Sequence, residues 1–198
     1  AAIEFLRKNG QAKAEKKASR IAAEGIVKVA VKDNSAAIVE VNSETDFVAK
    51  NEKFQTFVEK VAQQALASDA ADMDAFMEEK WLEDNSKSVK DILVEQVAVI
   101  GENLKIRRFE KVTAENGCVV DYIHGGGRIG VVVVAETATV NDTVQEALKN
   151  LAMQIAALNP KYIDRSEVSA DYIAHEKEIL LAQIKNDPKE SQKPEKVI

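Results

Sequence analysis

A glycine-rich segment is the first place in this sequence where residue types and spacing suggest chemistry. Gly125, Gly127 and Gly130 have the G-x-G-x-x-G spacing of a loop that binds the pyrophosphate of a dinucleotide. Such a loop must end a strand and open a helix, because the helix N-terminus holds the phosphates. Here the segment runs into Val131–Val134, a run of valines that is typical of a strand. We therefore predict a glycine-rich hairpin turn at this point and no nucleotide site.

The residues that could support catalysis or bind a metal are few. His124 opens a His-Gly-Gly-Gly sequence similar to the oxyanion loop of some lipases, but the chain has no G-x-S-x-G elbow to supply the nucleophile. His124 and His175 are the only histidines and fall in separate expected elements, and Cys118 is the only cysteine, so neither a disulfide nor a thiolate zinc cluster can form within the chain. The sequence also has no P-loop, EF-hand loop or HExxH motif. We expect no catalytic residue, metal or cofactor, and hence no enzyme.

Phe47 is the residue whose position has two interpretations. It lies seven residues before Phe54, so an unbroken helix would place both side chains on one buried face. Alternatively, Phe47 is exposed on a loop or short turn beside Asp46, as aromatic anchors in protein recognition often are. The spacing by itself leaves both interpretations open.

Hydrophobic periodicity predicts the elements that must position these residues. Apolar and polar residues alternate through 25–31 and 36–41 around a turn cluster, as in a β-hairpin. A helix with one apolar face is expected from about Asn51 to Ala67. The other expected elements are a short helix around Met73–Trp81, a helix from Ser88 to Gly101, strands at 104–112, 119–123 and 128–135, a helix at 143–157 and a long helix at 166–185.

Individual residues predict where these helices begin and end. Ser88 is followed by Asp91 three residues later, which is close to a capping box. Gly101 is placed to terminate that helix, and Asn159-Pro160 is expected to stop the next long one. Residues 1–10 are predicted to be the last turns of a helix ended by Gly10, which suggests that an N-terminal element precedes them.

The predicted elements repeat within the chain. The apolar positions of the 51–67 helix recur 90 residues later, and residues 38–41 recur 93 residues later at 131–134. Each half is thus strand, turn, strand and helix, and the first copy has three extra residues within the stretch around Thr45–Lys50. Function often resides on such lengthened connections, although amphipathic helices can also resemble one another by chance. The matching helix positions are Phe54, Val58, Val61, Ala62 and Ala65 with Val144, Leu148, Leu151, Ala152 and Ile155.

Composition limits the classes of partner. The net charge is −6, from 27 basic and 33 acidic residues, which argues against nucleic acid because that partner requires a concentrated positive surface. The basic segment Lys13–Arg20 is expected to be a solvated linker or helix, and it is the one segment that keeps RNA binding as a minor alternative. No apolar run is long enough to span a membrane, and residues 1–10 lack the features of a signal peptide. We expect a cytoplasmic protein without a membrane, nucleic-acid or small-molecule partner.

Three segments resemble motifs of one known family. Val41–Asn51, with the sequence VNSETDFVAKN, closely resembles the signature segment of elongation factor Ts. Ile100–Arg108 and Tyr122–Val131 resemble two further motifs of that family, and Ala18–Gly25 resembles the linker that enters its core. The resemblance runs from residue 1 to about residue 185 in the expected order, and it implies an α+β core of two related subdomains, each a small antiparallel sheet packed with helices, plus a long C-terminal helix.

The resemblance also implies a function and a set of contact residues. The family exchanges GDP for GTP on elongation factor Tu. Thr45, Asp46, Phe47 and Val48 match the segment that enters this GTPase and disturbs its magnesium site, with Phe47 as an apolar wedge. Further positions that match the family's contacts with the GTPase are Ile100, Gly101 and His124. The residues themselves leave other roles open for these three: core residue, helix terminator and turn residue.

Domain boundaries complete the expectations. We predict a remnant of an N-terminal helical domain with its linker at 1–24, a first core subdomain at 25–115 and a second at 116–198 that ends in a truncated tail. The resemblance implies that the rest of the N-terminal domain and a further C-terminal segment are missing. A protein-interaction scaffold without exchange activity is the alternative function.

Overall fold

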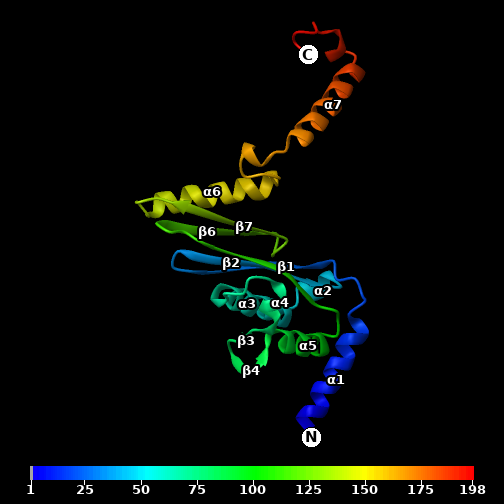
Figure 1. Ribbon diagram of the computed structural model, residues 1–198, viewed down its shortest axis with the longest axis vertical. Coiled ribbons are helices and arrows are strands. Elements are labelled where there is room, and N and C mark those ends of the chain that lie inside the picture. The colour runs from blue at the N-terminus through cyan, green and yellow to red at the C-terminus, as the bar shows by residue number, and fades with distance from the viewer. Residues whose placement is uncertain (1) are drawn as a thin grey trace. The chain divides into compact units, whose positions relative to one another are not determined.

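The computed structural model describes residues 2–198 (Figure 1). The chain divides into two compact units, the first ending at Leu158 and the second beginning at Asn159. The first contains three small antiparallel sheets and six helices among its described residues, and the second contains a long helix. The expected α+β class, with small antiparallel sheets and a long C-terminal helix, is confirmed.

A three-stranded antiparallel sheet forms the centre of the first unit. Its strand order is β1 (Glu24–Lys32), β2 (Ser35–Ser43) and β5 (Lys105–Thr113). β1 and β2 form the predicted hairpin, whose turn places Asp33 at a positive φ of 54°. Aspartate tolerates this conformation better than most residues do, which explains its place in the turn.

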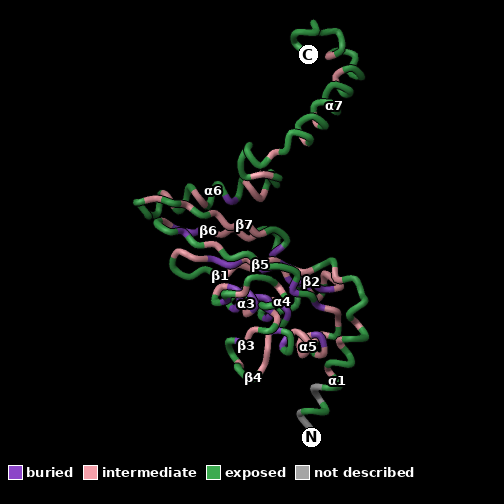
Figure 2. Tube along the Cα trace, viewed as in Figure 1, coloured by how far each residue is buried: buried purple, intermediate pink, exposed green. Residues whose placement is uncertain are grey.

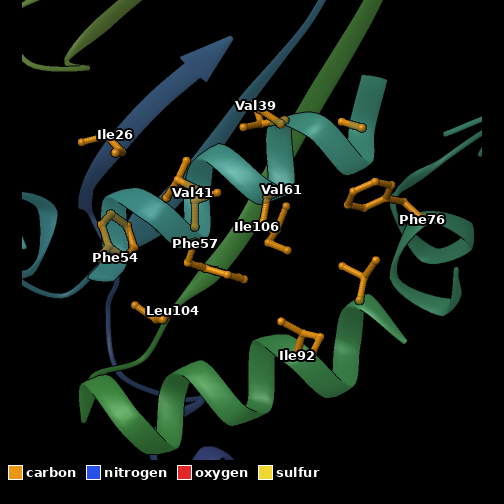
Figure 3. Close-up of a cluster of buried hydrophobic side chains, with 14 of the residues drawn as sticks. Ile26, Val39, Val41, Phe54, Phe57, Val61, Phe76, Ile92, Leu104 and Ile106 are labelled. Carbon is orange, nitrogen blue, oxygen red and sulfur yellow. The ribbon is translucent and has the colours of Figure 1, made fainter. Parts of the chain in front are cut away.

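Helix α3 (Glu52–Ala67) covers one face of this sheet and buries the apolar positions predicted for it. Alternate β2 residues, Ala37, Val39 and Val41, belong to the same core, and Figure 3 shows Val39 and Val41 beside α3. On its other side α3 meets a layer that adds Trp81 and Ile92 to the core. This layer consists of α4 (Met73–Glu78), β3 (Lys80–Trp81), β4 (Asp84–Ser88) and α5 (Val89–Ile100).

Two predictions in this region have different outcomes. The helix expected around Met73–Trp81 ends at Glu78, and Trp81 lies instead in the short β3–β4 hairpin, which the sequence did not predict. The capping box is confirmed, since Ser88 and Asp91 exchange side-chain to backbone hydrogen bonds at the start of α5. Periodicity failed at Trp81 because two-residue strands are too short to show alternation.

A second hairpin packs on the opposite face of the sheet. β6 (Gly117–His124) and β7 (Ile129–Glu136) lie between β1–β2 and helix α6 (Asp142–Leu158) (Figure 1). A small core of Ala36, Ala114 and Val119 fills the space between the two hairpins. From α3 onward the layers are therefore helix, sheet, hairpin and helix, with the α4–α5 layer on the other side of α3.

The internal repeat is present as β1–β2–α3 and β6–β7–α6. Asn51 caps α3 through its side chain, and Asn141, 90 residues later, caps α6 in the same way. Eight residues separate β2 from α3 (44–51), whereas five separate β7 from α6 (137–141). The difference is the three residues predicted from the change of offset.

The end of the first helix was predicted wrongly. α1 (Ala2–Lys17) continues through Gly10, and the basic segment therefore begins as helix. A Cβ at Gly10 would lie 3.8 Å from the Ala98 Cβ on α5, an ordinary van der Waals distance, so Gly10 lies where α1 packs against α5 and does not end the helix. Gly101, in contrast, has the left-handed conformation of a helix terminator, with φ of 89°.

The second unit contains α7 (Ala170–Asn186) between the short 3₁₀ helices η1 (Arg165–Glu167) and η2 (Glu190–Gln192). The predicted start at Ser166 is wrong: Ser169 accepts a hydrogen bond from the Tyr172 N–H and caps α7. Asn159 has a positive φ of 46° and follows the end of α6 as predicted. Among the described residues, no helix is long and apolar enough to cross a membrane.

Candidate functional site

The extra residues of the first connection form a separate helical turn. α2 (Asp46–Ala49) is capped by Thr45, whose hydroxyl accepts a hydrogen bond from the Val48 N–H at 3.3 Å. Asn51 then starts α3 with a new cap, so the two helices are not continuous. Because of this break, Phe47 does not share the buried face of Phe54.

Phe47 projects into solvent. Its side chain is 80% exposed, while Ala49 is buried and Val48 packs against the main core. The interpretation of Phe47 as a core residue is therefore wrong, and the exposed alternative holds. The neighbouring Asp46 is bonded to Lys50 at 2.8 Å, and this hydrogen bond together with the lysine charge lowers the pKa of Asp46.

Glu102 attaches the start of this segment to the turn after α5. One of its carboxylate oxygens accepts hydrogen bonds from the N–H groups of Glu44 and Thr45, at 3.0 and 3.1 Å. The other accepts from the Thr45 hydroxyl at 2.6 Å. Hydrogen bonds to an ionised acceptor are among the stronger ones in proteins, so this carboxylate fixes the chain immediately before α2.

Glu44 makes the reciprocal connection. Its carboxylate accepts a hydrogen bond from the Asn103 N–H at 2.6 Å and lies 3.6 Å from the Arg20 guanidinium. Asn103 in turn donates its side-chain amide to the Arg20 carbonyl at 2.8 Å. The turn before α2, the turn after α5 and the segment that enters β1 are thus held together by side chains.

This arrangement brings two of the predicted contact segments together. Gly101 directly precedes Glu102, and its carbonyl accepts a hydrogen bond from Lys17. Ile100 is half-buried against the main core, which places it as a support for the turn. Thr45–Val48 and Ile100–Gly101 therefore belong to one locally braced region.

His124, the last residue of β6, makes no hydrogen bond with that region in the described structure and instead contacts Tyr122. Its Nδ1 is 2.8 Å from the Tyr122 hydroxyl, and the Lys149 ammonium of α6 lies over the Tyr122 ring. The imidazole is exposed at the rim of the glycine turn. His124 is thus a second candidate contact, carried by the second hairpin.

The glycine turn has a structural explanation. Gly125, Gly126 and Gly127 all have positive φ, and the Gly127 carbonyl accepts a hydrogen bond from the Val27 N–H at 2.7 Å. A Cβ at Gly130 would lie 2.6 Å from a methyl carbon of Val27. These glycines therefore allow the second hairpin to approach β1, and the predicted hairpin turn is confirmed.

Sequence reasoning missed the bracing residues. Glu44 and Glu102 are 58 residues apart, and neither carries a motif that indicates a partner. The two glutamates, Asn103 and Arg20 all lie within segments of the family resemblance, but the resemblance implied no bracing contact for any of them. A glutamate in a polar turn is most often solvated, so nothing local pointed to these contacts.

The region has the character of a protein-recognition surface. It presents one large exposed aromatic on a braced platform, and the described residues include no group of three or more His, Cys, Asp or Glu side chains that could hold a metal. Exposed aromatic residues on a rigid support are typical anchors at protein interfaces.

Comparison with known proteins identifies the family. The family model described as Elongation factor TS matches residues 44–198. Curated relatives named elongation factor Ts include those of Clostridioides difficile strain 630, 49% identical over 199 residues, and Halothermothrix orenii, 46% identical over 200 residues. Both matches cover the whole of this chain and 65% of the relative's length.

The chain therefore belongs to the elongation factor Ts family. It spans about two thirds of the length of these relatives, at 65%.

Proposed function

We propose that this chain is a guanine-nucleotide exchange factor that binds elongation factor Tu in its GDP form and promotes GDP release during translation elongation in the cytoplasm. Phe47 acts as an apolar wedge that enters the GTPase beside its magnesium site, with Thr45, Asp46 and Val48 around it. The observation that carries the proposal is the 80% exposure of Phe47 on a capped and braced helical turn.

The physical basis of exchange is linkage between two binding equilibria. A factor accelerates GDP release when it binds the nucleotide-free GTPase more tightly than the GDP-bound form, and GDP must then weaken the factor's binding by the same ratio. Magnesium neutralises much of the phosphate charge, so displacing its ligands lowers nucleotide affinity without breaking a covalent bond. Such a factor needs a wedge that keeps its shape, and it needs no catalytic residue.

The other candidate residues have distinct proposed roles. Ile100 and Gly101 support the turn that braces the wedge, and Asp46, oriented by Lys50, offers polar contacts beside it. His124 contacts a different part of the GTPase from the second hairpin. Two separated grips would favour one arrangement of the partner's domains.

The direct test measures release of fluorescent GDP from elongation factor Tu in the presence of excess unlabelled nucleotide. We expect the chain to accelerate release and Phe47→Ala to lower the acceleration about 30-fold, because losing an interface anchor costs about 2 kcal/mol. The matched control is Leu82→Ala, which truncates another exposed apolar side chain (54% exposed) in the turn between β3 and β4. This control should leave release unchanged.

Other outcomes would contradict the proposal in recognisable ways. Equal losses in Phe47→Ala and Leu82→Ala would show that the wedge is not specific. Complex formation without accelerated release would favour the scaffold function. Absence of any complex with elongation factor Tu would remove the proposed partner for this chain.

A further inference from the structure

The unassigned feature that carries most information is the pair of glutamates that joins the two turns. Each glutamate accepts hydrogen bonds from the opposite turn: Glu102 from Glu44 and Thr45, and Glu44 from Asn103. All three bonds to Glu102 end within three residues of Phe47, at the N-terminal side of α2.

The carboxylate of Glu102 is used within its own chain. Both of its oxygens accept hydrogen bonds, and the residue is half-buried. Phe47, which follows the bonded segment, is exposed. Glu102 is therefore suited to hold the wedge and not to touch a partner.

Bracing of this kind affects recognition through conformational entropy. A loop that is already held in its bound conformation loses less freedom when it binds, and a wedge must also resist deformation while it displaces groups of the partner. The bonds to Glu102 restrain the two peptide groups and the cap that determine where α2 starts.

We propose that Glu102 is a positioning residue for nucleotide exchange, which acts through Phe47 by fixing the start of α2. This inference rests on the proposed function. It goes further by assigning a task to a residue whose carboxylate oxygens both accept hydrogen bonds within this chain.

Two substitutions of Glu102 distinguish the effect of its side-chain length from the effect of its charge. Glu102→Gln removes the charge but retains the length: its carbonyl oxygen can accept the two N–H groups, and its amide can donate to the Thr45 hydroxyl, which can act as an acceptor. Glu102→Asp retains the charge but shortens the side chain by one methylene, so it no longer reaches the Glu44–Thr45 backbone.

The experiment follows GDP release from elongation factor Tu at increasing concentrations of each variant of this 198-residue chain. We expect Glu102→Asp to lower the maximal release rate about tenfold while the half-saturating concentration changes less, because binding through other contacts remains. Glu102→Gln should stay within about threefold of the original rate, since the bonds are retained. The opposite order, with Gln inactive and Asp active, would show that charge matters and would overturn the proposal.

A double variant tests whether Glu102 acts through Phe47. If it does, adding Glu102→Asp to Phe47→Ala should change release by less than about twofold, whereas independent residues would show their full separate losses. A full tenfold additional loss would show that Glu102 does not act through Phe47 and would overturn the proposal.

Amide hydrogen exchange tests the bracing in the absence of the GTPase: Glu102→Asp should speed exchange at the Glu44 and Thr45 amides and leave the Phe57 amide in α3 unchanged. Unaltered exchange at Glu44 and Thr45 would contradict the bracing role.

The outcomes also separate this inference from the proposed function. If Phe47→Ala has no effect on release, the wedge itself is wrong. If Phe47→Ala lowers release and Glu102→Asp does not, the wedge stands and only the positioning role fails.

Discussion

The two repeated units, β1–β2–α3 and β6–β7–α6, share a pattern of residues but differ in burial. In α3 the matched positions Phe54 and Val61 are fully buried. In α6 the equivalent of Val61 is Leu151, which is 48% exposed, and Ala152 is the one buried residue described for that helix. Figure 2 shows the same contrast, with several buried residues along α3 and mostly exposed or intermediate residues along α6.

The cause lies in what covers each helix. α3 is packed between the central sheet and the layer that carries Trp81 and Ile92, so the whole of its apolar face loses contact with solvent, while the polar residues on its opposite side stay exposed. α6 packs on its own hairpin through one side. An amphipathic pattern thus specifies a helix and the direction of its apolar face, while the neighbouring layers determine how much of that face is buried.

The largest expected effect tests this difference in burial. Phe54→Ala should lower the free energy of unfolding by about 3–5 kcal/mol, because it leaves a cavity in a well-packed core. The matched change Val144→Ala, at the equivalent position of α6, should lower the free energy of unfolding by about 1 kcal/mol or less, because Val144 is only half-buried. Denaturant unfolding of both variants measures the contrast, and equal losses would show that α6 is as tightly packed as α3.

The second comparison is between the connection from β2 to α3 and the shorter connection from β7 to α6. Replacing residues 44–51 by the shorter sequence of residues 137–141 keeps an asparagine cap for α3 but removes α2 and the partners of Glu102. We expect unfolding to become easier by about 1–2 kcal/mol from the lost hydrogen bonds. Nucleotide release should fall to the level of Phe47→Ala.

Measurements of unfolding and of GDP release on this variant with the shorter connection distinguish an effect on the fold from an effect on function. If the chain with the short connection still accelerates release, the activity does not reside in the three-residue difference. If it fails to fold, the connection is required for the architecture itself.

The smallest expected effect is a pH dependence confined to the first repeat, β1–β2–α3. Partial burial raises the pKa of Glu40 on β2, but hydrogen bonds from Arg108 at 2.7 Å and Arg107 at 2.9 Å outweigh this and hold the pKa below its usual value. A lowered pKa in the folded state means that the interaction stabilises the protein at neutral pH. This contribution is lost as the pH falls through the folded-state pKa.

Glu40→Gln provides the measurement for this site. At pH 7 the substitution should cost about 1 kcal/mol, because both arginines are largely exposed and screened. The difference between the variant and the original chain should shrink as the pH falls through the lowered pKa of the Glu40 carboxyl, because the protonated side chain no longer carries the charge that the arginines stabilise. Val133 occupies the matched strand position in the second repeat, β6–β7–α6, so no corresponding dependence is expected there. A difference that persists unchanged in acid would exclude the carboxylate as its source.

Local sequence signals predicted most of the fold. Both hairpins, the helices α3, α5 and α6, the capping box at Ser88 and the terminator at Gly101 follow from patterns that span a few residues. The failures occurred where a distant segment changes the meaning of a local signal, or where an element is too short to show a pattern. Gly10 stands at a helix–helix contact instead of a helix end, and Trp81 belongs to a hairpin of minimal length.

The sequence by itself determined the α+β elements, their duplication and the three-residue excess before α3, because periodicity and turn chemistry are local properties of the chain. Only the tertiary structure decided that Phe47 is exposed and that Glu102 braces it. Periodicity describes one helix at a time, so it could not show that α2 and α3 are separate. The bonds between Glu44, Thr45 and Glu102 join residues almost sixty positions apart, and they exist because the packing of α5 against the central core brings its final turn beside the end of β2.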